Sequence, residues 1–289
     1  MLELKNLCVS YRKQPVVHNV SFGVQPGQIV GLVGESGSGK STIVRSMLGL
    51  LAKGGQITSG EIFFDNQKIS AFSKKDWTRI RGKEISMIFQ YPERSMDPVI
   101  SIGNQFCESM KASRRLEKKE VLEHAAALLS ELHLDNPERI LRSYPFELSG
   151  GMCQRVAVAM AMVNNPRLLL ADEPTSALDV TVQAQTIDVM MELRRKYGTA
   201  ILLVTHNMGV IAHMADMVGV VYHGELVEWG RRKEVLYSPA HPYTKALIRA
   251  IPTMDGKLPE YIQVTENMPY TIISETHWAG TQPEQQKRI

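Results

Sequence analysis

The stretch that decides the fold is Gly34-Glu35-Ser36-Gly37-Ser38-Gly39-Lys40-Ser41-Thr42, which matches the pattern GxxxxGK[ST]. It follows the apolar run Ile29 to Val33, which predicts a buried strand, and its last residues begin a predicted helix. Glycines let the backbone curl so that its N–H groups point at phosphates, and the start of the helix adds a positive dipole end. Lys40 is expected to reach the β- and γ-phosphates, and Ser41 to ligate Mg²⁺.

Two carboxylates, Asp172 and Glu173, end another apolar run, Leu168 to Ala171. The carboxyl ends of strands are where α/β sheets place their ligands. Asp172 is therefore predicted to hold Mg²⁺ through water, and Glu173 to polarise an attacking water as a general base. The alternative is a pair of solvated carboxylates that cap the next turn, which the nearby phosphate loop makes the weaker interpretation.

The rest of the chain alternates predicted strands and helices, which is typical of a mostly parallel sheet. A change of period between residues 111 and 134 predicts an amphipathic helix, and the tail beyond residue 256 has weak periodicity. Residues 2–33, 59–64, 85–89, 200–204, 218–222 and 226–229 read as strands, 181–196 reads as a helix, and the apolar helical face comprises Leu116, Val121, Leu122, Ala125, Leu128, Leu129 and Leu132.

Composition excludes several classes of protein. A net charge of +3 from 33 basic and 30 acidic residues gives no basic footprint of a nucleic-acid binder. Three dispersed cysteines, Cys8, Cys107 and Cys153, disfavour disulfides and metal or iron–sulfur sites, which favours a reducing cytosol. We expect no export signal at the N-terminus, which lacks a basic segment followed by an apolar one, and the apolar runs are shorter than the roughly 18 residues that cross a bilayer.

The stretch Leu148 to Arg155, LSGGMCQR, resembles the LSGGQ signature of ATP-binding-cassette (ABC) ATPases. The resemblance implies that Ser149, Gly150 and Gly151 bind the γ-phosphate of ATP held by an opposite subunit, so that two sites need two subunits. Met152 departs from the usual glutamine, but the serine and both glycines are present.

Other positions fall in the order that the ABC family has. Tyr11 matches the aromatic residue that stacks on adenine, and Gln90 matches the glutamine that touches Mg²⁺ and reports nucleotide state to the membrane subunit. Ser176 to Asp179 resembles the loop that couples the two ATP sites, and His206 resembles the histidine that contacts the γ-phosphate. Taken singly, Tyr11 reads as a half-buried strand residue, Gln90 as a surface residue and His206 as a strand-end histidine.

The resemblance therefore implies the ABC ATPase fold, an α/β nucleotide-binding core with a mostly parallel sheet, an antiparallel β subdomain and an inserted helical subdomain at about residues 91–165. We expect an ATPase domain over residues 1–255 and a loosely packed extension over 256–289. The implied catalytic residues are Glu173, His206, Lys40 and Gln90; the nucleotide-binding residues are Tyr11, Gly34, Ser36, Gly37, Ser38, Gly39, Lys40, Ser41, Thr42, Gln90, Asp172, Ser149, Gly150, Gly151 and Asp179; and the Mg²⁺ ligands are Ser41, Gln90 and Asp172.

Tyr237 to Leu247 and Tyr144 to Glu147 resemble segments of the oligopeptide, dipeptide and nickel importer branch, and the chain resembles the first (D-type) of its two ATPase subunits. No cysteine follows Cys153, so an iron–sulfur cluster is not expected beside ATP and Mg²⁺. Peptide is the favoured cargo, and nickel or a metal chelate is the alternative.

The implied partners are two membrane permease subunits, a second homologous ATPase subunit in a heterodimer or homodimer, and indirectly an extracellular solute-binding protein, but no nucleic acid. The implied location is peripheral, at the cytoplasmic face of the cell membrane. A non-transport ABC ATPase of DNA repair or translation is the distant alternative.

Overall fold

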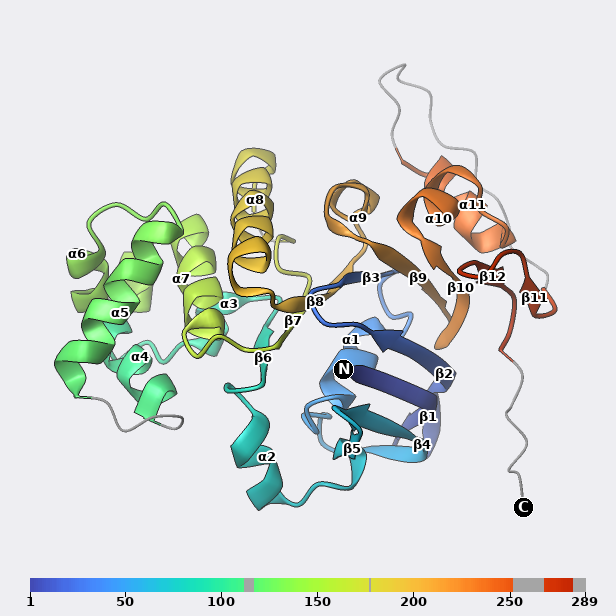
Figure 1. The fold of residues 1–289 in the computed structure, drawn as a ribbon, viewed down its shortest axis with the longest axis horizontal. Coiled ribbons are helices and arrows are strands. Elements are labelled where there is room, and N and C mark those ends of the chain that lie inside the picture. The colour runs from blue at the N-terminus through green and yellow to red at the C-terminus, as the bar shows by residue number, and fades with distance from the viewer. Residues whose placement is uncertain (112–116, 177, 252–267, 283–289) are drawn as a thin grey trace. The chain divides into compact units, whose positions relative to one another are not determined.

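The computed structural model describes residues 1–111, 117–176, 178–251 and 268–282 (Figure 1). The chain folds into two compact units, and the second interrupts the first in sequence. The first unit comprises Met1–Phe72 and Leu202–Ile289, and the second comprises Ser73–Ile201.

The first unit holds two sheets. Its elements are β1 (Leu2–Tyr11), β2 (Gln14–Val24), β3 (Ile29–Val33), α1 (Lys40–Ser46), β4 (Gly55–Phe64), β5 (Gln67–Lys68), the 3₁₀ turn η1 (Ile69–Ala71), β8 (Ala200–Thr205, from Leu202 onward), α9 (Met208–Met214), β9 (Met217–Tyr222), β10 (Glu225–Arg231), α10 (Arg232–Tyr237), α11 (Pro242–Arg249), β11 (Thr271–Ile272) and β12 (Trp278–Ala279).

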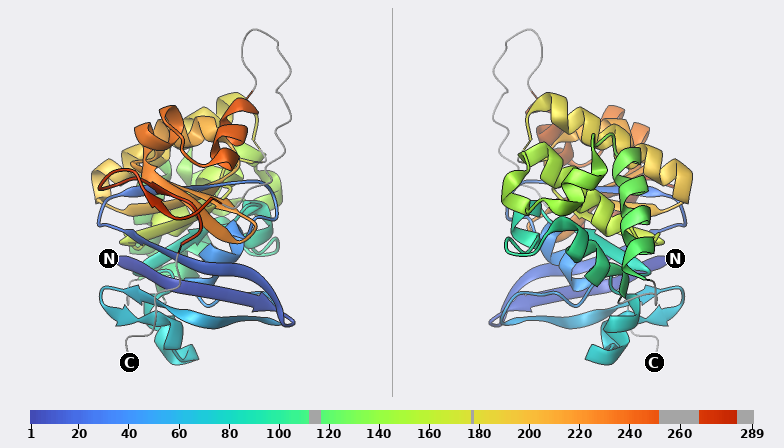
Figure 2. Two further views of the ribbon diagram at one scale, coloured as in Figure 1. Left: turned by 90° about the vertical axis from the view of Figure 1, so that its right-hand side faces the viewer. Right: turned by 90° about the vertical axis from the view of Figure 1, so that its left-hand side faces the viewer.

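The antiparallel sheet has the strand order β2-β1-β4-β5, and its long blue arrows run together in Figures 1 and 2. β1 is its central long strand, with Leu4 opposite Phe22 of β2 and Ile62 of β4. Leu2 and Leu4 are each 1% exposed, while Glu3 between them is exposed. This alternation buries one face of the strand, as expected for a sheet with one solvated side.

In the first unit the second sheet has the neighbours β11-β12-β10-β9-β3-β8. All five residues of β3 are buried, and β3 pairs in parallel with β9 from Val30 opposite Met217 to Val33 opposite Val220. β9 and β10 form an antiparallel hairpin, as predicted, and β12 pairs with β10. Residues 268–282, the described part of the predicted extension, thus add two short strands to this sheet. The boundary at residue 255 remains a prediction.

The second unit combines two parallel strands with most of the long helices. Its elements are α2 (Lys74–Ile80), β6 (Ile85–Ile88), α3 (Pro92–Ser95), α4 (Ile102–Lys111), α5 (Lys118–Glu131), α6 (Pro137–Arg142), the 3₁₀ turn η2 (Pro145–Glu147), α7 (Gly150–Met162), β7 (Leu168–Asp172) and α8 (Val180–Tyr197). β6 and β7 pair in parallel from Ile85 opposite Leu168 to Ile88 opposite Ala171. The green helices α4 to α7 gather in one cluster in Figure 1 and in the right panel of Figure 2.

The predicted amphipathic helix is confirmed as α5, whose buried face includes Val121, Ala125, Leu128 and Leu129. Leu116, also predicted on that face, lies outside the described residues. The predicted fold class is confirmed, since parallel pairs, an antiparallel β subdomain and a helical cluster are all present. Within the described ranges, no helix has the length and apolar character needed to span a membrane.

Candidate functional site

The loop from Gly34 to Gly39 leaves the buried strand β3 and leads directly into α1. Three of its residues have positive φ angles, with values of 151° at Gly34, 83° at Gly37 and 102° at Gly39. A Cβ on Gly34 would lie 2.1 Å from the carbonyl oxygen of Val221, and one on Gly39 would lie 3.2 Å from that of Val16. Glycine is therefore required at Gly34 for both backbone angle and space.

Lys40 lies inside this curl and is only 4% exposed. Its Nζ donates to the carbonyl oxygens of Gly34 at 2.8 Å and Glu35 at 2.6 Å, and to Ser38 Oγ at 3.2 Å. The loop thus surrounds a single ammonium group. Ser41 and Thr42 are half-buried in the first turn of α1, and Ser36 in the loop is exposed. The predicted phosphate-binding residues therefore all lie in the loop or in the first turn of the helix that follows it.

Two other predicted residues belong to the first unit. Tyr11 is half-buried at the end of β1, where its ring covers Gly55, since a Cβ on Gly55 would lie 2.5 Å from Tyr11 Cε1. His206 is exposed directly after β8, before Asn207, whose side chain accepts a hydrogen bond from the N–H of Gly209 at the start of α9. The predicted adenine contact of Tyr11 and phosphate contact of His206 remain predictions.

In the second unit, the structure brings Gln90 and Glu173 together. Ile88 of β6 is paired with Ala171 of β7. Gln90 lies two positions after Ile88, and Glu173 lies two positions after Ala171. Gln90 Nε2 donates to Glu173 Oε2 at 3.0 Å. Glu173 has φ 49°, an uncommon value for a residue other than glycine, and Asp172 beside it is 1% exposed.

The predicted signature and the predicted coupling loop each lead into a helix of the second unit. Ser149 is the N-cap of α7, its Oγ accepting from the N–H of Met152 at 3.4 Å, and Ser149 and Gly150 are exposed. Asp179 caps α8 through Oδ1, which accepts from the N–H groups of Thr181 and Val182 at 3.0 Å each.

Gly151 fits closely against α8, since a Cβ there would lie 2.7 Å from Val182 Cγ1. A larger side chain at position 151 would therefore displace the Val182 side chain. Ala177, in the middle of the predicted coupling loop, lies outside the described residues.

Residues 17–176 match the family model described as ABC transporter. The chain belongs to the ABC transporter family. Residues 227–276 also match a model for the oligopeptide/dipeptide transporter C-terminal region. The family assignment thus agrees with the glycine loop, the carboxylate pair and the signature helix described above.

Two relatives in this family carry transport names. The chain is 42% identical over 274 residues to the oligopeptide transport ATP-binding protein AppD of Bacillus subtilis, covering 93% of this chain and 84% of that one. It is 39% identical over 274 residues to the dipeptide transport ATP-binding protein DppD of Lactococcus lactis subsp. cremoris, covering 93% of this chain and 78% of that one. Among solved structures, the ATP-binding cassette MJ0796, described as dimeric, post-hydrolysis and bound to ADP and Pi, superposes with a TM-score of 0.72 at 28% identity, over 80% of this chain and 99% of that chain.

One contact to the phosphate loop of this ABC family member was missed from the sequence. Tyr243, in α11 of the C-terminal region, accepts a hydrogen bond at its hydroxyl oxygen from the N–H of Glu35 at 2.9 Å. From the sequence, Tyr243 was identified only as part of the segment Tyr237 to Leu247, which resembles the importer branch. Since the two residues are 208 positions apart, no local pattern pointed to the contact.

Cys153, in the signature helix, is 3% exposed, and its Sγ lies 3.4 Å from the carbonyl oxygen of Pro145. Burial, and then the negative charge of Glu93, raise the pKa of the Cys153 thiol. A thiol held in its protonated form is a poor nucleophile, so its role is packing. Across the described part of the chain, no group of three or more His, Cys, Asp or Glu side chains is placed to hold a metal ion.

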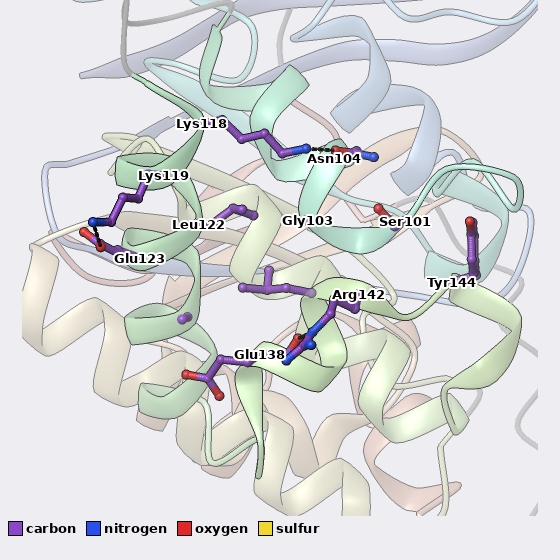
Figure 3. A pocket seen from close by; sticks show the side chains of 12 residues that line it. Ser101, Gly103, Asn104, Lys118, Lys119, Leu122, Glu123, Glu138, Arg142 and Tyr144 are labelled. Atoms are coloured by element: carbon purple, nitrogen blue, oxygen red, sulfur yellow. Dashed lines mark hydrogen bonds and ion pairs between the residues drawn. The ribbon is translucent and has the colours of Figure 1, made fainter.

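A cavity of about 820 Å³ lies in the second unit among α4, α5 and α6 (Figure 3). Lys118 Nζ donates to Asn104 Oδ1 at 3.0 Å across it, and Lys119 pairs with Glu123 at 3.9 Å. Its lining comprises Ser101, Gly103, Asn104, Lys118, Lys119, Leu122, Glu123, Ala126, Glu138, Leu141, Arg142 and Tyr144. None of the residues predicted to bind nucleotide is among them.

Proposed function

We propose that this chain binds ATP with Mg²⁺ at the loop Gly34–Thr42 and hydrolyses it to drive the import of peptides through separate permease subunits. The observation that carries the proposal is the shape of that loop, in which glycines at positive φ wrap the backbone around the buried ammonium of Lys40. Such a loop offers N–H donors and one cation to a triphosphate, and phosphoryl transfer depends on this electrostatic positioning.

Oxygen donors are the ligands that Mg²⁺ prefers, and the predicted set supplies the Ser41 hydroxyl, the Gln90 amide oxygen and the Asp172 carboxylate. The hydrogen bond from Gln90 to Glu173 uses the amide nitrogen, so the amide oxygen that would face a cation takes no part in it. Bound Mg²⁺ would neutralise charge on the β- and γ-phosphates.

Glu173 is our candidate for the general base, and the amide of Gln90 fixes one of its carboxylate oxygens. A carboxylate at the end of a strand can act as a general base by accepting the proton of an attacking water. His206 is assigned the γ-phosphate contact on its order in the sequence and its exposure at the end of β8.

A second cassette subunit is part of the proposal. Ser149 and Gly150 are exposed at the start of α7, as residues that reach the nucleotide of a partner subunit would need to be. MJ0796, which shares the fold at 28% identity, is described as a dimer, and this supports a paired arrangement. A homologous ATPase subunit is the favoured partner, and a second copy of this chain is the alternative.

The C-terminal region is the basis for assigning the cargo. Its match to the oligopeptide/dipeptide transporter C-terminal region, together with the printed names of the relatives, favours peptides over nickel. The proposed location is the cytoplasmic face of the membrane, where two permease subunits would hold the chain, with a solute-binding protein on the other side.

The test is purification of the tagged full chain from detergent-extracted membranes of its source, followed by reconstitution into liposomes. We expect two multispanning proteins and an ATPase subunit to copurify. In the reconstituted liposomes, labelled dipeptide or oligopeptide should accumulate only when MgATP is supplied. Uptake of labelled nickel without uptake of peptide would mean that the transported solute is nickel and not peptide. ATP hydrolysis that stays unlinked to any membrane protein would contradict the transport function.

A further inference from the structure

The C-terminal region reaches the phosphate loop through one buried side chain. Tyr243 is 2% exposed, and its hydroxyl oxygen lies 2.9 Å from the backbone nitrogen of Glu35, the second residue of the loop. The side chain of Glu35 is exposed, whereas its backbone is held at the N–H by Tyr243 and at the carbonyl oxygen by Lys40. This N–H is held by protein rather than by water.

A second contact holds the other end of the loop. The N–H of Gly224, in the turn between β9 and β10, donates to the carbonyl oxygen of Ser38 at 2.9 Å. The ring of Tyr222, at the end of β9, packs on the ring of Tyr243 with centroids 4.1 Å apart. One contact comes from the Tyr243 side chain and the other from the backbone of the β9–β10 turn, and together they hold the loop on both sides of Gly37.

The position of Tyr243 is itself fixed by a buried carboxylate. Glu228 in β10 is 0% exposed, and its oxygens accept from the N–H groups of Ala240 at 2.8 Å and His241 at 3.0 Å and lie 2.7 Å from His277 Nε2. The His241 ring then caps α11, with Nδ1 accepting from the N–H of Tyr243 at 3.1 Å. The start of α11 is thus tied to β10 and to the segment that carries His277.

We infer that Tyr243 is a positioning residue for the nucleotide site, which holds the phosphate loop in its binding shape through the N–H of Glu35. This inference rests on the proposed function, since it assigns a role in ATP binding. A loop that is already shaped loses less conformational freedom when a ligand binds, and this raises affinity without a new ligand contact. Burial raises the pKa of Tyr243 to about 12, so its hydroxyl stays neutral over the working range of the protein.

The test is Tyr243→Phe in the full chain, which removes the hydroxyl and keeps the ring against Tyr222. The matched control is Tyr237→Phe, the same chemical change in the same region at a side chain that is 81% exposed. We expect the Kd for MgATP, measured by calorimetry, to rise about threefold to tenfold in Tyr243→Phe, the scale of one lost hydrogen bond. Tyr237→Phe should match the parent.

Amide hydrogen exchange on the nucleotide-free chain gives a readout that a purely structural role would not move. In the parent, the amide of Glu35 should exchange more slowly than those of the exposed neighbours Ser36 and Gly37, and Tyr243→Phe should remove that difference. The parent measurement needs no variant, so it decides the point even if Tyr243→Phe folds poorly.

An unchanged Kd in folded Tyr243→Phe, or a Glu35 amide that exchanges as fast as Ser36 in the parent, would overturn the inference. A lower melting temperature with both readouts unchanged would also overturn it, since Tyr243 would then serve packing alone. If the parent binds no MgATP, the proposed function fails, and the exchange comparison alone decides whether Tyr243 holds the loop.

Discussion

Gln90 and Glu173 extend from paired positions of β6 and β7 and join through a hydrogen bond of 3.0 Å from Gln90 Nε2 to Glu173 Oε2. The left-handed backbone of Glu173, at φ 49°, accompanies this arrangement. Strain of this kind is retained where the surrounding structure fixes a residue for a task. The pair therefore links the candidate base to the residue that the family resemblance assigns to sensing nucleotide state.

Glu173→Gln tests the base directly. The amide keeps the shape of the side chain but cannot accept a proton, so ATP should bind and remain while turnover falls by roughly 10²-fold or more. Steady-state ATPase activity of the assembled transporter and retention of labelled ATP after gel filtration would measure the two effects. Normal turnover with no retained ATP would mean that Glu173 is not the base.

Lys40→Ala tests the phosphate loop. The change removes the ammonium that three loop oxygens surround, and with it the charge that stabilises phosphoryl transfer, so ATP hydrolysis should fall to background. Lys53→Ala, at an exposed lysine of the same unit, controls for loss of one positive charge. Hydrolysis by Lys40→Ala near the parent rate would remove the loop from the mechanism.

The sequence predicted the strands and the loop chemistry because both depend on local patterns. The run Ile29 to Val33 is apolar throughout and is buried throughout, and GxxxxGK[ST] directly after it fixes the turn. Helix α5 was visible for the same reason, since its buried positions recur at helical spacing.

Contacts between distant segments were not predictable in this way. Gln90 and Glu173 are 83 positions apart, and their roles were assigned by order in the sequence, not by geometry. The short strands β11 and β12 follow no clear period, and the buried pair Glu228 and His277 depends on their pairing with β10. A single sequence carries no signal for which charged residues will meet inside a fold.

His241 predicts a pH dependence of stability. Burial lowers the pKa of the His241 ring below 6.5. The Glu228 carboxylate acts to raise this pKa, and the Lys245 charge acts to lower it further. Below about pH 6.5 the unfolded chain therefore binds a proton that the folded chain excludes, and stability falls as pH falls.

His241→Asn keeps a side chain that can cap α11 but cannot titrate, because Asn is a preferred N-cap residue. Its melting temperature should fall less than that of the parent between about pH 8 and about pH 5, since only the parent carries this proton linkage. Groups that do not interact with His241 contribute alike in both proteins, so the difference reports His241 together with its coupling to Glu228 and Lys245. Parallel curves for the two proteins would show that His241 contributes no linkage.

The composite site between two subunits is tested by Ser149→Arg. Ser149 is exposed and small, and a partner nucleotide would have to approach it and Gly150 closely, so a long cation there should block closure of the pair. ATP binding by this chain should persist, while hydrolysis stops at the site whose nucleotide faces Ser149. Because Ser149 also caps α7, at a worth of about 1 kcal/mol, Ser149→Ala serves as the control that loses the cap without adding bulk.

Photo-crosslinking of labelled nucleotide to each subunit separates the outcomes. With a homologous partner subunit, Ser149→Arg should disable hydrolysis at the partner's site, whereas Lys40→Ala should disable the site on this chain. Ser149→Ala should show a lower melting temperature with much of the hydrolysis retained. If Ser149→Arg instead abolishes nucleotide binding to this chain alone while the partner still hydrolyses ATP, each subunit is a self-contained ATPase, and the exposed start of α7 has no role across the interface.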